Sequence, residues 1–103
     1  MAFSLTRKEL NEWKKQVISG EIAIITHYWL DSRFPDATTV TKVGCTNIQK
    51  LIDWGKKYDL KPEWIDLKEN YPHFDLFGEI QIKVLLNEKQ FDQIKRFKIK
   101  THY

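Results

Sequence analysis

The sequence predicts one α+β domain spanning residues 1–103, with three or four helices packed on a small sheet of two or three strands and covering one of its faces. Three observations lead to this class. A chain of 103 residues is long enough for one domain with one core. Hydrophobic residues make up 42% and aromatic residues 14%, which excludes a disordered chain. Apolar residues recur at helical spacing in some segments and form short β-branched runs in others.

The first predicted element is a helix over residues 7–18. Thr6 and Glu9 have the spacing of a capping box, in which each side chain binds the other residue's backbone N–H. Gly20 is placed to end the helix in a left-handed conformation. The apolar stripe of this helix comprises Leu10, Trp13 and Val17.

Two strands are predicted next. Residues 21–26 form a short isoleucine-rich run typical of a buried strand, and residues 39–43 are rich in β-branched side chains. Between them, Pro35 and Asp36 place a loop in the second half of the segment 27–38.

A second helix is predicted over residues 47–58, where Thr46 and Gln49 repeat the capping-box spacing. Trp54 lies off the apolar stripe of this helix, so we expect it to be the most exposed tryptophan, at a ligand or partner surface. Pro62 indicates a turn or a brief helix, and residues 64–66 suit a short strand.

Residues 79–86 fit two patterns. Their alternation of apolar and polar side chains is that of a strand, whereas Phe77, Ile80 and Val84 form a helical stripe. We favour a helix that begins near Asp75 or Leu76. The expected core of the whole domain comprises Leu10, Trp13, Val17, Ile22, Ile24, Val40, Ile48, Leu51, Ile52 and Ile80.

The C-terminal segment is basic. Asn87 and Gln90 suggest a cap for a last short helix that turns Phe91 and Ile94 inward. Four cations then follow with no acid among them, namely Lys95, Arg96, Lys98 and Lys100. Because Phe97 and Ile99 alternate with cations, the segment could add a strand to the sheet edge and present a basic ridge to phosphates; the alternative is solvated charge.

Two polar clusters are the candidate sites. The first follows the strand 21–26; if the strand continues through Asp31, alternation places His27, Trp29, Asp31 and Arg33 on one face. The second contains His73 and Asp75, which point the same way in an extended segment. Asp75 has a competing structural role as the cap of the next helix.

These clusters allow more than one chemistry. His27, Asp31, His73 and Asp75 could bind a divalent metal or act as an acid/base pair oriented by carboxylates, with Arg33 holding a phosphate or carboxylate. The spacing matches no established metal-binding or catalytic motif, so we assign no metal ligands and leave any cofactor unknown. All of this depends on whether the two clusters converge in the fold.

The remaining composition bounds the class of protein. The net charge of +3 is mildly basic, and a mean hydropathy of -0.52 without a long apolar run predicts no membrane contact. The single cysteine, Cys45, excludes an internal disulfide framework and is expected to pack rather than react. With no export signal recognised, a cytoplasmic location is expected.

The segments THYWLDSRFPD, VTKVGCTNIQKLIDWGKKYDLKPEWID and YPHFDLFGE together resemble a small family of uncharacterised Bacillus proteins, the YneQ-like proteins, over nearly the whole chain. The central and closing segments are also distantly similar to a broader bacterial and phage domain of unknown function. Its acidic-Arg-Pro segment corresponds here to Asp31, Arg33 and Pro35, and its His-aromatic-Asp motif to His73–Asp75. The resemblance implies a helix after Asp75 and implies no activity.

Three classes of function stay open. The first is a binding module for a phosphate-bearing ligand, a nucleotide or nucleic acid, that uses His27, Arg33 and His73. The second is a regulator or inhibitor that binds a protein partner, such as a phage or host adaptor. The third is a small phosphoester hydrolase that uses the same residues, so the sequence leaves open whether the protein is an enzyme.

Overall fold

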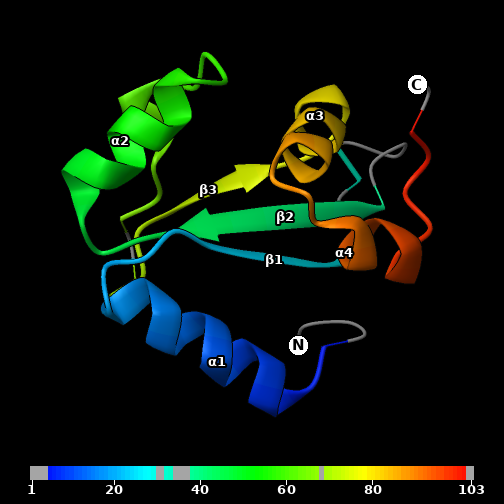
Figure 1. The fold of residues 1–103 in the computed structure, drawn as a ribbon, viewed down its shortest axis with the longest axis horizontal. Coiled ribbons are helices and arrows are strands. Elements are labelled where there is room, and N and C mark those ends of the chain that lie inside the picture. Colours follow the sequence, from blue (N-terminus) through cyan, green and yellow to red (C-terminus); the bar gives the residue numbers. More distant parts are fainter. Residues whose placement is uncertain (1–4, 30–31, 34–37, 68, 102–103) are drawn as a thin grey trace.

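The computed structural model describes residues 5–29, 32–33, 38–67 and 69–101, and these ranges form a small α+β domain. The helices are α1 (Arg7–Ile18), α2 (Ile48–Lys56), α3 (Glu79–Asn87) and α4 (Phe91–Arg96), with a short 3-10 helix, η1 (Pro62–Trp64). The strands β1 (Ala23–Tyr28), β2 (Thr39–Gly44) and β3 (His73–Leu76) form an antiparallel sheet with β2 in the centre. Figure 1 shows α1 on one side of the sheet and the other three helices on the opposite side. The expectation that the helices cover a single face is therefore wrong.

The two faces of the sheet are packed differently. On one face, Val43 of β2 and Phe74 of β3 join the main core with Leu51 and Val84, which come from α2 and α3. On the other face, Gly44 lies so close to α1 that a Cβ there would come within 2.8 Å of the Trp13 ring. Glycine at this position therefore allows α1 to approach the sheet.

Helix α1 has the predicted bounds. The Thr6 backbone N–H donates to Glu9 at 2.9 Å, and the Glu9 N–H donates to the Thr6 hydroxyl at 3.1 Å, which completes the capping box. Gly20 follows the helix with φ 82°, as a left-handed end requires.

The sheet differs from the prediction in two places. The short strand predicted over residues 64–66 does not form, because Trp64 ends a 3-10 helix and only Asp66 makes an isolated bridge, to His73. The first two strands form close to the expected positions, although β1 is shifted by two residues, from 21–26 to Ala23–Tyr28. Strand β3 was not predicted. Asp75 lies inside β3 rather than at a helix cap, because the ladder with β2 buries Phe74 and Leu76 on the core side. Helix α3 begins later, at Glu79.

Helix α2 confirms the second predicted helix, with two corrections. Its N-cap is Asn47, which accepts from the Lys50 N–H at 3.1 Å, whereas the Thr46 hydroxyl donates to the Val17 carbonyl at 2.8 Å. Trp54, expected to be the most exposed tryptophan, is buried and only 6% exposed. Its Nε1–H donates to the carboxylate of Glu88, the C-cap residue of α3, over a distance of 3.2 Å. Tertiary contacts thus override the helical stripe.

The C-terminal segment forms the helix α4 and no added strand within the residues that the structure describes. Phe97 is the C-cap of α4 and is buried against Tyr28, with ring centroids 5.1 Å apart. Lys98 then turns the chain with φ 50°, which a strand does not allow. The predicted basic ridge is therefore not formed, and Phe91, expected to point inward, is 58% exposed.

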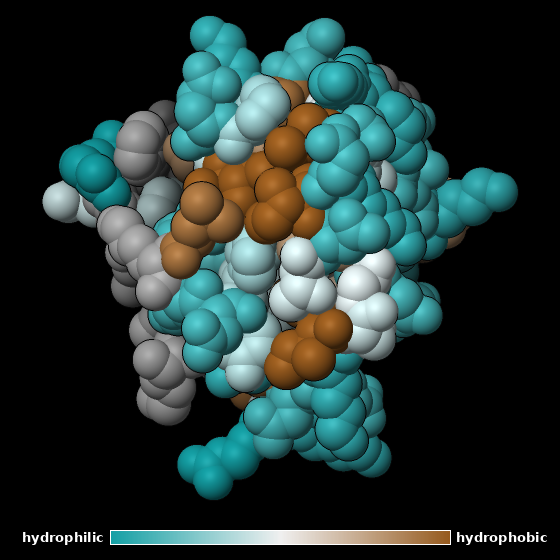
Figure 2. Space-filling model, turned by 90° about the vertical axis from the view of Figure 1, so that its left-hand side faces the viewer, coloured by the Kyte–Doolittle hydropathy of each residue, from teal (hydrophilic) through white to brown (hydrophobic). Residues whose placement is uncertain are grey.

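The expected core is only partly confirmed. Ile48, the first residue of α2, was expected in the core but is 37% exposed. Ile18, at the end of α1, is not among the expected core residues and is 61% exposed. Both helix ends lie on the side of the molecule shown in Figure 2, where apolar side chains gather in a larger and a smaller area. Trp13, Val17, Val40 and Leu51 are buried, and Leu10, Ile22, Ile24, Ile52 and Ile80 are half-buried.

In the described part of the chain no helix is long and apolar enough to cross a membrane.

Candidate functional site

The face of the sheet that α1 covers also carries a pocket. Helix α1 packs on the start of β1 through Trp13 and Val17. Further along the same face, the three strands contribute polar side chains to a pocket of about 250 Å³. The pocket is lined by His27, Trp29, Val40, Lys42, Asp75 and Phe77.

Strand register places the polar residues of this pocket side by side. His27 lies opposite Val40 on the β1–β2 ladder, and Lys42 lies opposite Asp75 on the β2–β3 ladder. Because side chains alternate along each strand, all four share one face of the sheet.

Lys42 is the central cation of the pocket. It lies on the middle strand and is half-buried. No hydrogen bond or ion pair joins its ammonium group to any residue that the structure describes. Because the ammonium group has no such partner, its charge is available to a bound anion.

His27 offers a neutral ring to the same pocket. Its Nδ1 lies 2.7 Å from the Tyr28 carbonyl oxygen, which only accepts, so Nδ1 carries the proton and donates. Burial lowers the pKa of His27 below its usual range, more strongly than the carbonyl raises it. At neutral pH the Nε2 atom is therefore an acceptor.

Two aromatic rings form the edge of the pocket. The Trp29 and Phe77 rings are 5.4 Å apart, centroid to centroid, with an interplanar angle of 36°. The Trp29 backbone N–H donates to the Thr38 carbonyl at 2.8 Å, which fixes Trp29 beside the end of the β1–β2 ladder. These rings offer apolar surface next to the charged groups.

A second group of ionisable side chains adjoins the pocket through Asp75. His73, two residues earlier on β3, is 4% exposed. Its Nε2 lies 3.4 Å from Oδ2 of Asp75 and 4.0 Å from Oδ2 of Asp66. Its Nδ1 lies 2.7 Å from the Tyr71 carbonyl oxygen and therefore donates to it.

The charges of this group depend on one another. Burial lowers the pKa of His73, but Asp75 and the Tyr71 carbonyl outweigh it, so this pKa is raised. Burial raises the pKa of Asp75, but its interaction with His73 outweighs it, so that pKa is lowered. Both shifts have the same cause, the attraction between a protonated His73 and an ionised Asp75.

The structure brings part of the predicted site together. His27, Trp29 and Asp75 line the pocket, and His73 lies next to it. Asp31 falls outside the described residues. Arg33 is exposed in a turn and does not belong to the described lining of this pocket.

Sequence reasoning missed three residues of the site, Lys42, Asp66 and Phe77. Lys42 interrupts the β-branched run 39–43, and a polar residue inside a central strand is a signal that sequence analysis could have used. Asp66 had no such signal, because only its bridge to His73 brings it to the sheet.

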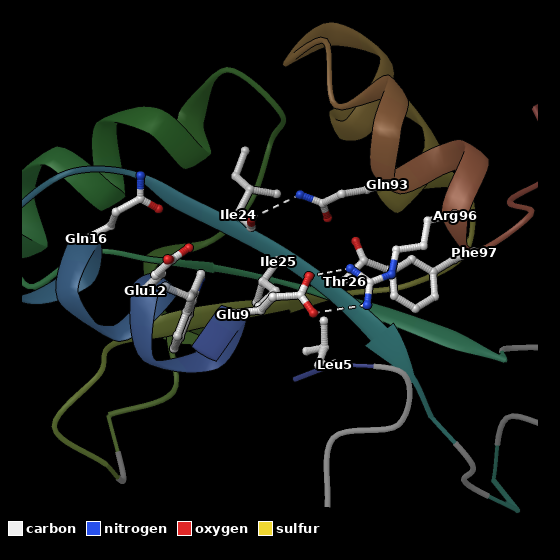
Figure 3. A pocket seen from close by; sticks show the side chains of 11 residues that line it. Leu5, Glu9, Glu12, Gln16, Ile24, Ile25, Thr26, Gln93, Arg96 and Phe97 are labelled. Carbon is white, nitrogen blue, oxygen red and sulfur yellow. Dashed lines mark hydrogen bonds and ion pairs between the residues drawn. The ribbon is translucent and has the colours of Figure 1, made fainter. Parts of the chain in front are cut away.

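The four cations of the predicted basic patch have different surroundings. Arg96 forms an ion pair with Glu9 of α1, as Figure 3 shows, and its Nη2 donates to Oε1 of Glu9 at 3.1 Å. The other members, Lys95, Lys98 and Lys100, are exposed. The cations therefore form no continuous strand surface.

The ion pair borders a second pocket, of about 200 Å³, between α1, β1 and α4 (Figure 3). Here Nε2 of Gln93 donates to the Ile24 carbonyl at 3.1 Å, and Nε1 of Trp13 donates to the Ala23 carbonyl at 3.0 Å. These side chains occupy acceptors of β1, which is an edge strand. This pocket is part of the packing around that edge.

Cys45 is fully buried, in agreement with the packing role expected for it. Its backbone N–H donates to the Pro72 carbonyl at 3.0 Å, which ties the end of β2 to the start of β3.

The fold and the pocket define the chain as a small α+β domain with a mixed polar and aromatic pocket on an antiparallel sheet. Among curated proteins, it is 57% identical over 97 residues to "Uncharacterized protein YneQ" of Bacillus subtilis (strain 168). The aligned region covers 94% of this chain and 98% of that protein. The chain belongs to the YneQ family. No family model and no solved structure matches it, so the distant similarity to a bacterial and phage domain stays a prediction.

Proposed function

We propose that this protein is a binding module for a phosphate-bearing ligand, and specifically for a mononucleotide held in the pocket of His27, Lys42 and Asp75. The observation that carries the proposal is Lys42, a half-buried cation on the central strand with no anionic partner among the described residues. A phosphate oxygen would provide that partner.

The rest of the pocket suits the remainder of a nucleotide. Trp29 and Phe77 offer ring surface on which a base can stack, and stacking of one base on an aromatic side chain contributes about 1–3 kcal/mol. Asp75 offers carboxylate oxygens that accept from amino groups of a base or from ribose hydroxyls. Nε2 of His27 is a further acceptor.

The size of the pocket limits the ligand. A volume of about 250 Å³ is below the ~300–1,000 Å³ of sites that enclose drug-sized molecules. We therefore infer that one nucleotide binds with part of its surface exposed. The C-terminal cations do not form a ridge that would track a nucleic-acid backbone, and this favours a mononucleotide over a long strand.

Calorimetric titration of the full chain with AMP, adenosine and ribose 5-phosphate tests the proposal. AMP should bind more tightly than either fragment, because only AMP fills both the cationic and the aromatic part of the pocket. The same titration with GMP, CMP and UMP defines the preferred base. Failure of all four nucleotides to bind at millimolar concentration would reject the proposal.

Matched variants locate the binding. Lys42→Met should weaken nucleotide binding by about tenfold or more, since a hydrogen bond to a charged group contributes about 1.5–3 kcal/mol. Lys83→Met, on α3 at the opposite face, should leave it unchanged. Trp29→Ala should weaken nucleotide binding. Trp64 is 54% exposed and does not line this pocket, so Trp64→Ala should leave binding unchanged. Equal affinity in Lys42→Met would place the ligand elsewhere.

The same samples discriminate the two other functions. Chromatography after incubation would reveal a nucleoside and free phosphate if the protein were a phosphoester hydrolase. A binder returns the nucleotide intact and shows nucleotide-dependent stabilisation of the fold. A regulator that acts only on a protein partner would show neither effect.

A further inference from the structure

We propose that Asp66, His73 and Asp75 form a binding site for a divalent transition-metal ion, with Zn²⁺ as the best fit. One ligand atom from each residue lies within 4.8 Å of the other two. The proposal does not depend on nucleotide binding, although Asp75 also borders the pocket.

The spacing of the atoms suits a metal better than a direct ion pair. Charged N–H···O hydrogen bonds are about 2.7–2.9 Å long, and the His73–Asp75 distance of 3.4 Å exceeds this. Ligand atoms about 2.0–2.1 Å from a tetrahedral zinc ion lie roughly 3.4 Å from each other. Oδ2 of Asp66 lies 4.0 Å from Nε2 of His73 and would have to approach that atom by about 0.6 Å.

His73 is oriented as metal-binding histidines are. Its side chain is 95% buried, since 5% of it is exposed, and its Nδ1–H donates to the Tyr71 carbonyl at 2.7 Å. That hydrogen bond leaves the lone pair of the neutral ring on Nε2, the atom that faces both carboxylates. A backbone carbonyl in this role fixes the ring and the tautomer of metal-binding histidines.

The backbone holds the three residues in place. Asp66 and His73 exchange two backbone hydrogen bonds, of 2.7 Å and 3.2 Å, in an isolated antiparallel bridge. Asp75 is two residues further along β3, so its side chain leaves the same face of the strand as that of His73. The site is thus built on sheet structure and not on a loose loop.

The donor set selects the class of ion. Two carboxylates and one neutral imidazole carry a charge of −2, which balances a divalent cation. Nitrogen and oxygen donors without a thiolate suit Zn²⁺ and its first-row neighbours. The Asp66 and Asp75 side chains are 33% and 43% exposed, so an ion can enter from solvent and keep a fourth position for water.

Calorimetry with Zn²⁺ on the full chain is the first test, and the visible absorption spectrum of added Co²⁺ is the second. We expect one ion per chain, a Co²⁺ spectrum of tetrahedral type, and a rise in melting temperature with Zn²⁺. Asp66→Asn and His73→Gln should each lower the Zn²⁺ affinity at least tenfold. If His73→Gln fails to fold, Asp66→Asn still decides, because Asp66 is partly exposed.

Two control variants test the location. Asp53→Asn, at an exposed site on α2, and His102→Gln, at another histidine of the sequence, should bind Zn²⁺ as the unmodified chain does. The proposal is overturned if Zn²⁺ does not saturate the chain at millimolar concentration. It is equally overturned if Asp66→Asn binds unchanged or if His102→Gln abolishes binding.

The outcome is separable from that of the proposed function. Lys42→Met should lose nucleotide binding and keep Zn²⁺, whereas Asp66→Asn should lose Zn²⁺ and keep binding of the nucleotide in a metal-free buffer. Failure in one titration with success in the other rejects only the corresponding proposal.

Discussion

Lys42 and Asp75 lie directly opposite each other on β2 and β3, and both side chains line the pocket on the α1 side of the sheet. No ion pair joins these two charges, and Oδ2 of Asp75 lies 3.4 Å from Nε2 of His73. The pocket therefore combines an available cation with a carboxylate that already has a partner.

The first prediction concerns the stability contributed by Lys42. Opposite charges across a strand pair contribute roughly 0.2–1 kcal/mol, and Lys42 lacks even an ion pair. Lys42→Met should therefore change the free energy of unfolding by less than about 1 kcal/mol in urea titrations. A loss of several kcal/mol would show that Lys42 has a structural role.

The second prediction concerns the phenol of Tyr58. Its burial and the hydrogen bond that its hydroxyl donates to the Glu88 carboxylate raise the pKa of Tyr58 to about 12. Ultraviolet absorbance titration should show one tyrosine that ionises near that pH and that is missing in Tyr58→Phe. Glu88→Gln should lower this pKa, because it removes the negative charge that opposes the phenolate. Circular dichroism at each pH confirms that the fold persists.

The third prediction concerns acid stability. The hydrogen bonds from Arg96, and those with Thr6 at the helix cap, lower the pKa of Glu9 to about 2, from 4.5. A depressed carboxyl pKa stabilises the fold above the unfolded value, so this contribution is lost as the pH falls from about 4.5 through about 2. Glu9→Gln should flatten the pH dependence of the melting temperature in that range. Because the pair is exposed, we expect about 0.2–1 kcal/mol at neutral pH.

Glu12→Gln is the matched control for Glu9, since it changes a neighbouring carboxylate on α1 for which no ion pair is seen in the described residues. An identical acid transition in the Glu9 and Glu12 variants would contradict the assignment to the Glu9–Arg96 pair.

The fourth prediction concerns a buried polar network between the sheet and α3. Nε2 of Gln81 donates to the Thr41 hydroxyl at 3.0 Å, and the Thr41 hydroxyl lies 2.7 Å from that of Thr26. Thr41→Val keeps the shape but leaves these partners unsatisfied, which should cost about 1–3 kcal/mol in chemical denaturation. Thr38→Val, at an exposed position before β2, should cost far less.

The fifth prediction separates the two sides of α2. Leu51 is fully buried, so Leu51→Ala should destabilise the fold by about 2–5 kcal/mol. Ile48 is 37% exposed, so Ile48→Ala should have a much smaller effect. Comparable losses in the two variants would mean that α2 packs through a different face.

Local signals in the sequence were enough for elements whose stability is local. The Thr6–Glu9 capping box lies within four residues, so its spacing predicted the start of α1. The same spacing failed at Thr46, because its hydroxyl binds carbonyls of α1 that are distant in sequence. Sequence predicted that His73 and Asp75 share a face, since this follows from extended backbone alone.

Only the tertiary structure decided which residues form the site. Strand β3 exists because β2 provides a hydrogen-bonding partner, and Asp75 could not be distinguished from a helix cap without that ladder. Pairing across the sheet also places Lys42 beside Asp75, and one bridge brings Asp66 to His73. The sequence alone determined the residue types and the α+β class. The contacts between distant segments, which have no local pattern, determined the pocket and the candidate metal ligands.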